Sequence, residues 1–171
     1  YKLEDYPSHA EGMTFPNPDK VYYSEDIFVG YRGFEKRGIK PLFAFGHGLS
    51  YTEFEYSDIR LSKECIKDGE MLQASVTITN RGKRAGKEVV QLYIADKESS
   101  VARPAKELKG FEKVALEPGE SKVVTFDITP EALSFYDDRG EGEWRTESGE
   151  FEVLIGSASD DIRLSKRFTL E

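Results

Sequence analysis

Apolar and polar residues alternate with a period of two over most of the chain beyond residue 54. In residues 72–79 every second position is apolar, and the positions between them carry Gln, Ser or Thr. A period of two places alternate side chains on opposite faces of a strand, so this pattern predicts a half-buried strand. The same alternation recurs in segments 90–94, 124–128 and 151–155, and Gln91 and Tyr93 are expected to face away from the apolar side. Further strands are predicted at 56–61, 108–116 and 162–170.

Turn-forming residues separate these strands, at 80–86, 117–120 and 137–140. Thr129 and Pro130 have the pattern of an N-cap followed by the first helical position, which predicts a single helical turn over 129–133 and the only helix of the chain. Gly110 predicts a bulge or a close backbone approach within strand 108–116. About seven short antiparallel strands predict an all-β fold, a two-sheet β-sandwich of fibronectin type III or immunoglobulin-like character.

Residues 1–51 differ from the rest, because they contain four of the seven prolines and many aromatic residues but little periodicity. Only the run Ile27-Phe28-Val29-Gly30-Tyr31 predicts a strand there, and the remainder is expected to be irregular. Such a segment cannot bury its own aromatic side chains. We therefore expect a boundary between residues 51 and 52, with residues 1–51 packing on the sandwich or on a domain outside this chain.

Composition and charge narrow the classes of function. The chain has 171 residues, of which 38% are hydrophobic and 33% charged, and no run approaches the roughly 20 apolar residues of a membrane span. The net charge of −8, with acidic and basic residues interleaved as at Lys106-Glu107, predicts a solvated surface and argues against nucleic acid or anionic membrane as a partner. The single Cys65 cannot form an internal disulfide. Tyr1 follows no initiator Met and opens no signal peptide, so the chain is expected to be part of a longer protein.

Nucleophilic or metal chemistry has few candidates here. The two histidines are His9, in the irregular segment, and His47, which lies between Gly46 and Gly48. A glycine-flanked histidine suits a catalytic or metal-binding group, but it also suits a tight turn in which glycine supplies a positive φ. We favour the turn, because no second ligand stands at metal-binding spacing. Gly46-x-Gly48 also lacks the third glycine and the Lys-Ser/Thr pair of a phosphate loop.

Carboxylates and aromatic rings are the other candidates. A retaining glycosidase requires two carboxyl groups about 5–5.5 Å apart, but the pairs Asp137-Asp138 and Asp160-Asp161 lie in turns and are expected to be solvated. Six aromatic residues form either a sugar-stacking platform or core and interface packing, and we favour packing. They are Tyr22, Tyr23, Tyr31, Tyr93, Tyr136 and Trp144. No catalytic, cofactor-binding or metal-binding residue is assigned, and no cofactor is expected.

Several motifs resemble one enzyme family. Residues 23–32 (YSEDIFVGYR) and 40–52 (KPLFAFGHGLSYT) closely resemble the junction between the α/β sandwich domain and the fibronectin type III-like domain of family 3 glycoside hydrolases. The segments that resemble the second domain are 86–93, 103–111, 133–137, 142–144 and 149–153. Ala44 stands where the family usually has proline and Gly33 where an aromatic is common, so we expect looser packing at both.

The resemblance implies a non-catalytic role for this chain. These enzymes are mostly β-glucosidases and β-xylosidases, which hydrolyse β-glycosidic bonds. Their nucleophile is an Asp of an upstream barrel domain and their acid/base is a Glu of the α/β domain, and no residue here matches either motif. Residues 1–51 would complete the α/β sandwich domain and linker, and residues 52–171 would form the fibronectin type III-like domain. That domain is expected to stabilise the catalytic domains, its partners, and to help shape the active-site rim. Carbohydrate substrate would be reached only through those domains.

Two alternatives remain open at this point. A carbohydrate-binding module predicts an exposed planar row of two or three aromatic rings on one sheet face. A stand-alone interaction domain predicts that residues 1–51 fold compactly on the sandwich. The fragment interpretation instead predicts an aromatic surface left exposed there, which favours self-association.

Overall fold

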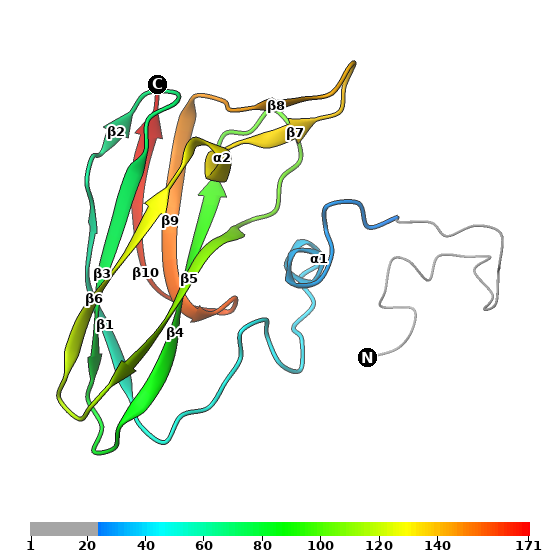
Figure 1. Ribbon diagram of the computed structural model, residues 1–171. Helices are drawn as coiled ribbons and strands as arrows, with labels where there is room; N and C mark the ends of the chain where they lie inside the picture. Colours follow the sequence, from blue (N-terminus) through cyan, green and yellow to red (C-terminus); the bar gives the residue numbers. More distant parts are fainter. Residues whose placement is uncertain (1–23) are drawn as a thin grey trace, which may run out of the picture.

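The computed structural model describes residues 24–171, which form two stacked β-sheets (Figure 1). One sheet has three strands in the order β1-β3-β6, and the other has five in the order β2-β10-β9-β4-β5. The strands of the first sheet are β1 (Phe54–Leu61), β3 (Leu72–Asn80) and β6 (Ser121–Ile128). Those of the second are β2 (Cys65–Ile66), β10 (Asp161–Leu170), β9 (Gly149–Ala158), β4 (Gly86–Asp96) and β5 (Glu107–Leu116). The predicted all-β sandwich and its seven strands are confirmed.

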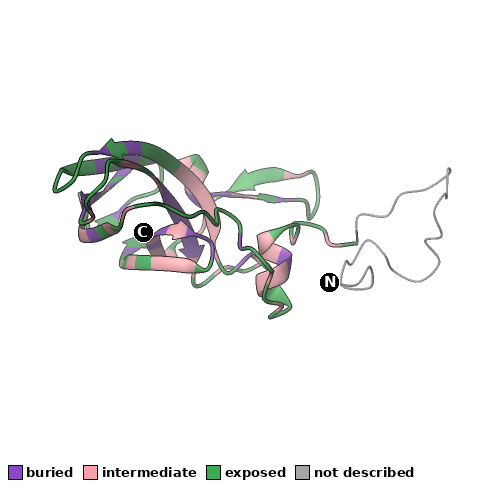
Figure 2. Ribbon diagram, turned by 90° about the horizontal axis from the view of Figure 1, so that it is seen from below, coloured by how far each residue is buried: buried purple, intermediate pink, exposed green. Residues whose placement is uncertain are grey.

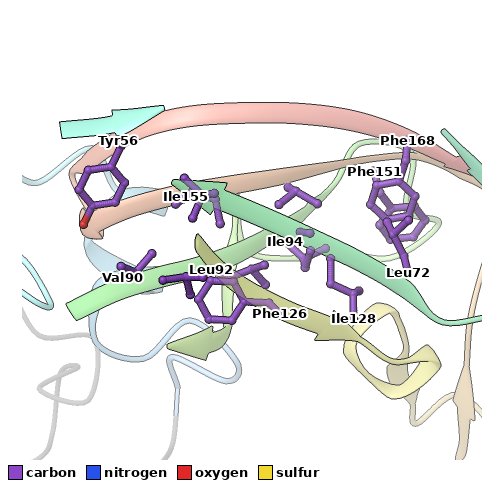
Figure 3. Packing of buried hydrophobic residues seen from close by; sticks show 14 of the residues in the cluster. Tyr56, Leu72, Val90, Leu92, Ile94, Phe126, Ile128, Phe151, Ile155 and Phe168 are labelled. Carbon is purple, nitrogen blue, oxygen red and sulfur yellow. The ribbon is translucent and has the colours of Figure 1, made fainter. Parts of the chain in front are cut away.

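The core lies between the two sheets and is built from the apolar side of each alternating pattern. Leu72, Val76 and Ile78 of β3 are fully buried, and Val90 and Leu92 of β4 meet them from the other sheet. Figure 3 shows Leu72, Val90 and Leu92 among the side chains that point into the space between the sheets. Because apolar burial contributes about 25 cal/mol per Å², this layer is the main source of stability.

Gly110 marks a bulge in β5, as the sequence predicts. Gly110 pairs with Leu92 and Leu108 pairs with Tyr93, so Lys109 is an extra residue between two consecutive partners. A Cβ atom on Gly110 would lie 3.2 Å from Cδ1 of Phe126, which explains why glycine fits at this position. The bulge changes which side chains β5 presents at its start.

The predicted helical turn is also confirmed, as α2 (Pro130–Leu133) with Thr129 in the extended N-cap conformation. Three short strands lie outside the predicted set: β2, β7 (Phe135–Asp137) and β8 (Glu143–Arg145). β7 and β8 pair only with each other and form a hairpin separate from both sheets. Runs of two or three residues are too short for periodicity to reveal.

The strand predicted over residues 27–31 is wrong, and so is the prediction that the chain has a single helix. Asp26 and Gly30 adopt positive φ angles of 51° and 56°, so the chain turns and continues as a helix, α1 (Tyr31–Lys36). Gly33 is buried, and a Cβ atom there would lie 2.2 Å from the backbone oxygen of Phe28. Gly33 therefore permits close packing, so the expectation that it loosens the segment is wrong too. Among residues 24–171, no helix has the length and apolar character to cross a bilayer.

Candidate functional site

The segment from α1 to residue 46 covers the outer face of the five-stranded sheet. β4 is buried at every position from 90 to 95, although only alternate residues face the core. The Tyr31 ring stacks on Phe45, with centroids 5.3 Å apart, and meets Tyr93 edge-on at 6.0 Å. The backbone N–H of Leu108 donates a hydrogen bond of 2.8 Å to the Tyr31 hydroxyl. The segment that precedes the sandwich therefore packs on the outward side of β4.

Gln91, next to this ring stack, fastens the end of the segment. Its Nε2 donates to the backbone oxygen of Ser157 at 2.6 Å, and the N–H of Ser159 donates to the backbone oxygen of Phe45 at 2.8 Å. Gly46 has a φ of +86°, and a Cβ atom on it would lie 2.2 Å from Gln91 Nε2. Only glycine allows the chain to pass this close to the amide.

Ion pairs fasten the α1 end of the same segment. Arg32 of α1 lies 3.2 Å from Glu107 of β5, which also accepts a hydrogen bond of 2.6 Å from Arg103. Burial opposes ionisation of Glu107, but Arg103 and the neighbouring cations outweigh it, so the pKa of Glu107 is lowered. Lys106 pairs with Glu35 of α1. The Lys106-Glu107 dipeptide is therefore not the solvated surface that the sequence suggested.

The same segment also carries an exposed apolar strip, which extends over residues 42–51. Leu49 is 95% exposed and Tyr51 92% exposed, although both are large apolar side chains. We define the apolar strip as Leu42, Phe43, Phe45, Leu49 and Tyr51. Figure 2 shows this side of the molecule largely in the exposed and intermediate colours. Contiguous exposed apolar surface is typical of protein–protein contact sites.

His47 belongs to a turn within the strip. Its backbone N–H donates to the Ala44 oxygen at 2.9 Å, and its imidazole lies against the Phe43 ring at 5.1 Å. Within residues 24–171, no group of three metal-ligating side chains comes together. The turn interpretation with a positive φ at Gly46 is confirmed, and His9 lies outside the described residues.

The carboxylates of the pairs Asp137-Asp138 and Asp160-Asp161 differ in burial and in their partners. Asp137 is buried and pairs with Arg139 at 2.8 Å and Arg145 at 3.3 Å, and the hydrogen bonds from Arg139 lower its pKa to about 2. Asp161 accepts hydrogen bonds from Ser157 and Arg163. The expectation that all four residues of these pairs are solvated is wrong for Asp137, whereas Asp138 and Asp160 are exposed.

The aromatic candidates fall into two groups. Tyr31 and Tyr93 take part in the packing described above, as expected. Tyr136 and Trp144 lie on the β7–β8 hairpin, where both are exposed and meet edge-to-face at 5.6 Å with an angle of 73°. They do not form a planar row with the other two. Tyr22 and Tyr23 lie outside the described residues.

Comparison with known proteins agrees with this arrangement. The family model for the fibronectin type III-like domain matches residues 88–159. A thermostable β-glucosidase B of Acetivibrio thermocellus is 52% identical over 96% of this chain, and a β-glucosidase of Bacteroides ovatus is 48% identical over 95%. This chain is related to the C-terminal part of family 3 β-glucosidases. It spans 22% of the length of each of these two relatives.

Solved structures of the family superpose closely on the described fold. β-Glucosidase 3B of Thermotoga neapolitana, determined in complex with glucose, is 45% identical with a TM-score of 0.86 and is covered to 22%. The family 3 β-glucosidase of Bifidobacterium adolescentis is 34% identical with a TM-score of 0.87 and is covered to 24%. These alignments include 97% and 98% of this chain, so the family resemblance holds for the N-terminal segment as well as for the sandwich.

Sequence reasoning missed the contacts that fasten the segment. Arg32, Arg103 and Glu107 look like ordinary surface charges, because alternating signs are typical of solvated faces. The one available signal was Gly46, whose positive φ was expected but whose proximity to Gln91 was not. The site as a whole suits protein–protein contact: a firmly held segment that presents an apolar strip.

Proposed function

We propose that this chain is the non-catalytic C-terminal module of a family 3 β-glucosidase, and that it braces the catalytic domains of that enzyme. The observation that carries the proposal is the apolar strip, which remains exposed although the segment bearing it is held on β4 by Tyr31 and Gly46. This chain spans only 22% of the length of such a relative, so a large partner surface is available in the same polypeptide.

The bracing role has a physical basis in the way the strip is presented. Contacts between domains of one chain typically bury roughly 600–1,500 Å². A strip that is held in its middle by Phe45 and upstream by Arg32 loses little conformational freedom when it docks, so more of the burial free energy appears as stabilisation. A rigid support of this kind keeps loops at an active-site rim near their working geometry.

Reconstitution tests the proposal directly. The chain alone should not hydrolyse an aryl β-glucoside, whereas mixing it with the separately produced remainder of the enzyme should restore activity. Phe43→Ala and Tyr51→Ala should weaken this restoration, and Val123→Ala, an exposed apolar truncation on the opposite sheet, should not. Hydrolysis by the chain alone, or equal restoration by all three variants, would contradict the proposal.

A carbohydrate-binding role receives less support. Tyr136 and Trp144 stand at 73° to each other, whereas a sugar-stacking row requires nearly coplanar rings. In a pull-down with cellulose, xylan or β-glucan, the chain should remain in the supernatant. Retention that is lost in Trp144→Ala would favour the binding module instead.

A further inference from the structure

The connection between β3 and β4 concentrates positive charge on a chain that is otherwise acidic. Together with the first two residues of β4 it has the sequence RGKRAGK, with four cations and no carboxylate, whereas the whole chain has a net charge of −8. In Figure 1 this connection lies at the end of the sandwich opposite to the C-terminus and the β7–β8 hairpin. We refer to residues 81–87 as the basic loop. It shares no residue with the apolar strip.

The backbone of the basic loop is held by the side chain of Asn80, which is fully buried. The Nδ2 of Asn80 donates a hydrogen bond of 2.8 Å to the backbone oxygen of Arg84, and its Oδ1 accepts one of 3.0 Å from the N–H of Gly82. The N–H of Arg81 donates to the backbone oxygen of Glu53 at 2.8 Å. Because the loop is already fixed at these positions, binding of a partner requires little ordering of its backbone.

Most of the charge on the basic loop is not neutralised by the protein. Arg81 lies 2.5 Å from the Glu55 carboxylate, but Lys83, Arg84 and Lys87 form no ion pair within residues 24–171. All three of these residues are exposed. Ammonium and guanidinium groups only donate hydrogen bonds, so their N–H groups remain available to an anion from outside. The basic loop is therefore a preformed group of free cations.

Carboxylates around the loop limit the shape of its partner. Glu53 adjoins the loop through the bond to Arg81, and Glu117 and Glu120 lie in the turn between β5 and β6. The N–H of Glu120 also borders the loop, because the backbone oxygen of this residue accepts the N–H of Asn80 at 2.9 Å. A broad anionic surface, such as duplex DNA or a lipid bilayer, would bring its phosphates against these exposed carboxylates, and like charges repel. A narrow chain can cross the basic loop without meeting them.

The weakness of single surface contacts favours a polymer over a small anion. An exposed ion pair contributes little in water, so the basic loop does not hold one phosphate or acetate ion firmly. A polymer keeps many anions within reach, and this high effective concentration keeps the loop occupied while individual contacts break and form again. The planar guanidinium of Arg84 suits carboxylate groups, because it can form two parallel hydrogen bonds with each.

We infer that the basic loop binds an acidic polysaccharide, a narrow chain whose repeating uronic acid units carry carboxylates. Lys83, Arg84 and Lys87 pair with these carboxylates, and no covalent bond is made or broken. The polymer is an attachment surface and not a substrate. The choice of a polysaccharide rests on the proposed function, because a β-glucosidase acts on carbohydrates. The loop goes beyond that function by holding the enzyme on a polymer that its upstream domains do not cleave.

Affinity electrophoresis of this chain in gels that contain polygalacturonate tests the inference. The chain should be retarded relative to a polymer-free gel, and added salt should reduce the retardation because it screens exposed charges. The double variant Lys83→Gln, Arg84→Gln should raise the apparent dissociation constant by roughly threefold or more. The matched control Arg60→Gln, Lys67→Gln removes the same charge from exposed positions outside the loop and should leave the constant unchanged.

Both double variants should keep the unfolding midpoint of the parent chain, because all four side chains are exposed. Equal retardation of the two variants, or no retardation of the parent chain by polygalacturonate, would overturn the inference. Hydroxyethyl cellulose, a neutral polymer, should not retard the chain, and equal retardation by it would show that charge is not recognised. Binding to polyglutamate or duplex DNA at least as strong as to polygalacturonate would assign the loop to an acidic protein or a nucleic acid instead.

Reconstitution separates this inference from the proposed function. The variant Lys83→Gln, Arg84→Gln should restore hydrolysis of a soluble aryl β-glucoside as fully as the parent chain does, because the basic loop lies outside the apolar strip. Loss of restoration in this variant would place the loop in the bracing contact and overturn its assignment to an external polymer. Retardation without restoration by the parent chain would overturn the bracing role alone, and restoration without retardation would overturn this inference alone.

Discussion

The sandwich and the segment that precedes it differ in how far they bury their apolar side chains. In the sandwich, the inward side chains of both sheets, such as Leu72 of β3 and Leu92 of β4, belong to one buried cluster. In the segment, Tyr31 packs on Tyr93 of β4 and Phe45 stacks on Tyr31, but Leu49 and Tyr51 are almost fully exposed. The contrast teaches that the sandwich buries its apolar side chains within its own two sheets, whereas the segment leaves several of its own exposed.

Truncating one apolar side chain in each region gives the largest expected difference. Leu72→Ala should lower the free energy of unfolding by about 2–5 kcal/mol, because Leu72 is fully buried and a cavity remains. Phe43→Ala should change it by less than about 0.5 kcal/mol, because Phe43 is 66% exposed. Urea unfolding of both variants measures the difference. A cost for Phe43→Ala close to that for Leu72→Ala would erase the distinction between the two regions.

Substitution of one glycine is expected to weaken the attachment of the segment to the sandwich. Gly46→Ala should cost about 1–3 kcal/mol, because it forces an L-residue into positive φ and against the Gln91 amide. Gly48→Ala is the matched control, since a Cβ atom there meets nothing within 4 Å. Thermal unfolding, with hydrogen exchange over residues 44–48, measures both. Equal effects at the two glycines would show that the segment is not held at Gly46.

Removal of the Tyr31 hydroxyl tests the attachment at α1, the other end of the segment. Tyr31→Phe should cost about 1–2 kcal/mol, because it leaves the Leu108 N–H without its acceptor while keeping the ring stack. Tyr51→Phe removes the same atom from a side chain that is 92% exposed and should be neutral. Chemical denaturation of the pair decides the matter, and a neutral Tyr31→Phe would mean that ring packing alone holds α1.

Lowering the pH is expected to have the smallest effect, which is confined to the β7–β8 hairpin. The folded pKa of Asp137, about 2, lies below its ordinary value of 3.8, so its contribution to stability is complete above the ordinary value and is lost as the pH falls through about 2. Trp144 emission should therefore change with a midpoint near pH 2. In Asp137→Asn this transition should be absent, while Asp138→Asn should retain it. A midpoint near 4 in the parent chain would indicate that the arginines do not hold the carboxylate.

Short-range pattern was sufficient for the sandwich and insufficient for its outer layer. Alternation in residues 72–79 predicts β3 because the core face repeats within the strand itself. The burial of Tyr93 depends instead on Tyr31, 62 positions earlier, which no local period records. The run at residues 27–31 favours a strand by composition, but strand propensity expresses packing against neighbours, and Gly30 turns the chain into α1.

The same limit applies to the candidate site. Asp137 looked like a turn carboxylate, and its burial follows from Arg145 on the next strand of the hairpin. Glu107 looked like a surface charge, and its role follows from Arg32 in a distant segment. Residue types and turn positions could be predicted, but which charges meet could not, because ion pairs join segments whose sequences carry no common period.

The bulge in β5 affects how readily the protein associates with other molecules. β5 is the outer strand of its sheet, and an unpaired outer strand is a template for adding a strand from another molecule. The extra residue Lys109 interrupts that edge, and the Tyr31 hydroxyl occupies the N–H of Leu108 beside it. The start of this edge is therefore blocked against strand addition, which disfavours fibril growth from that end of β5.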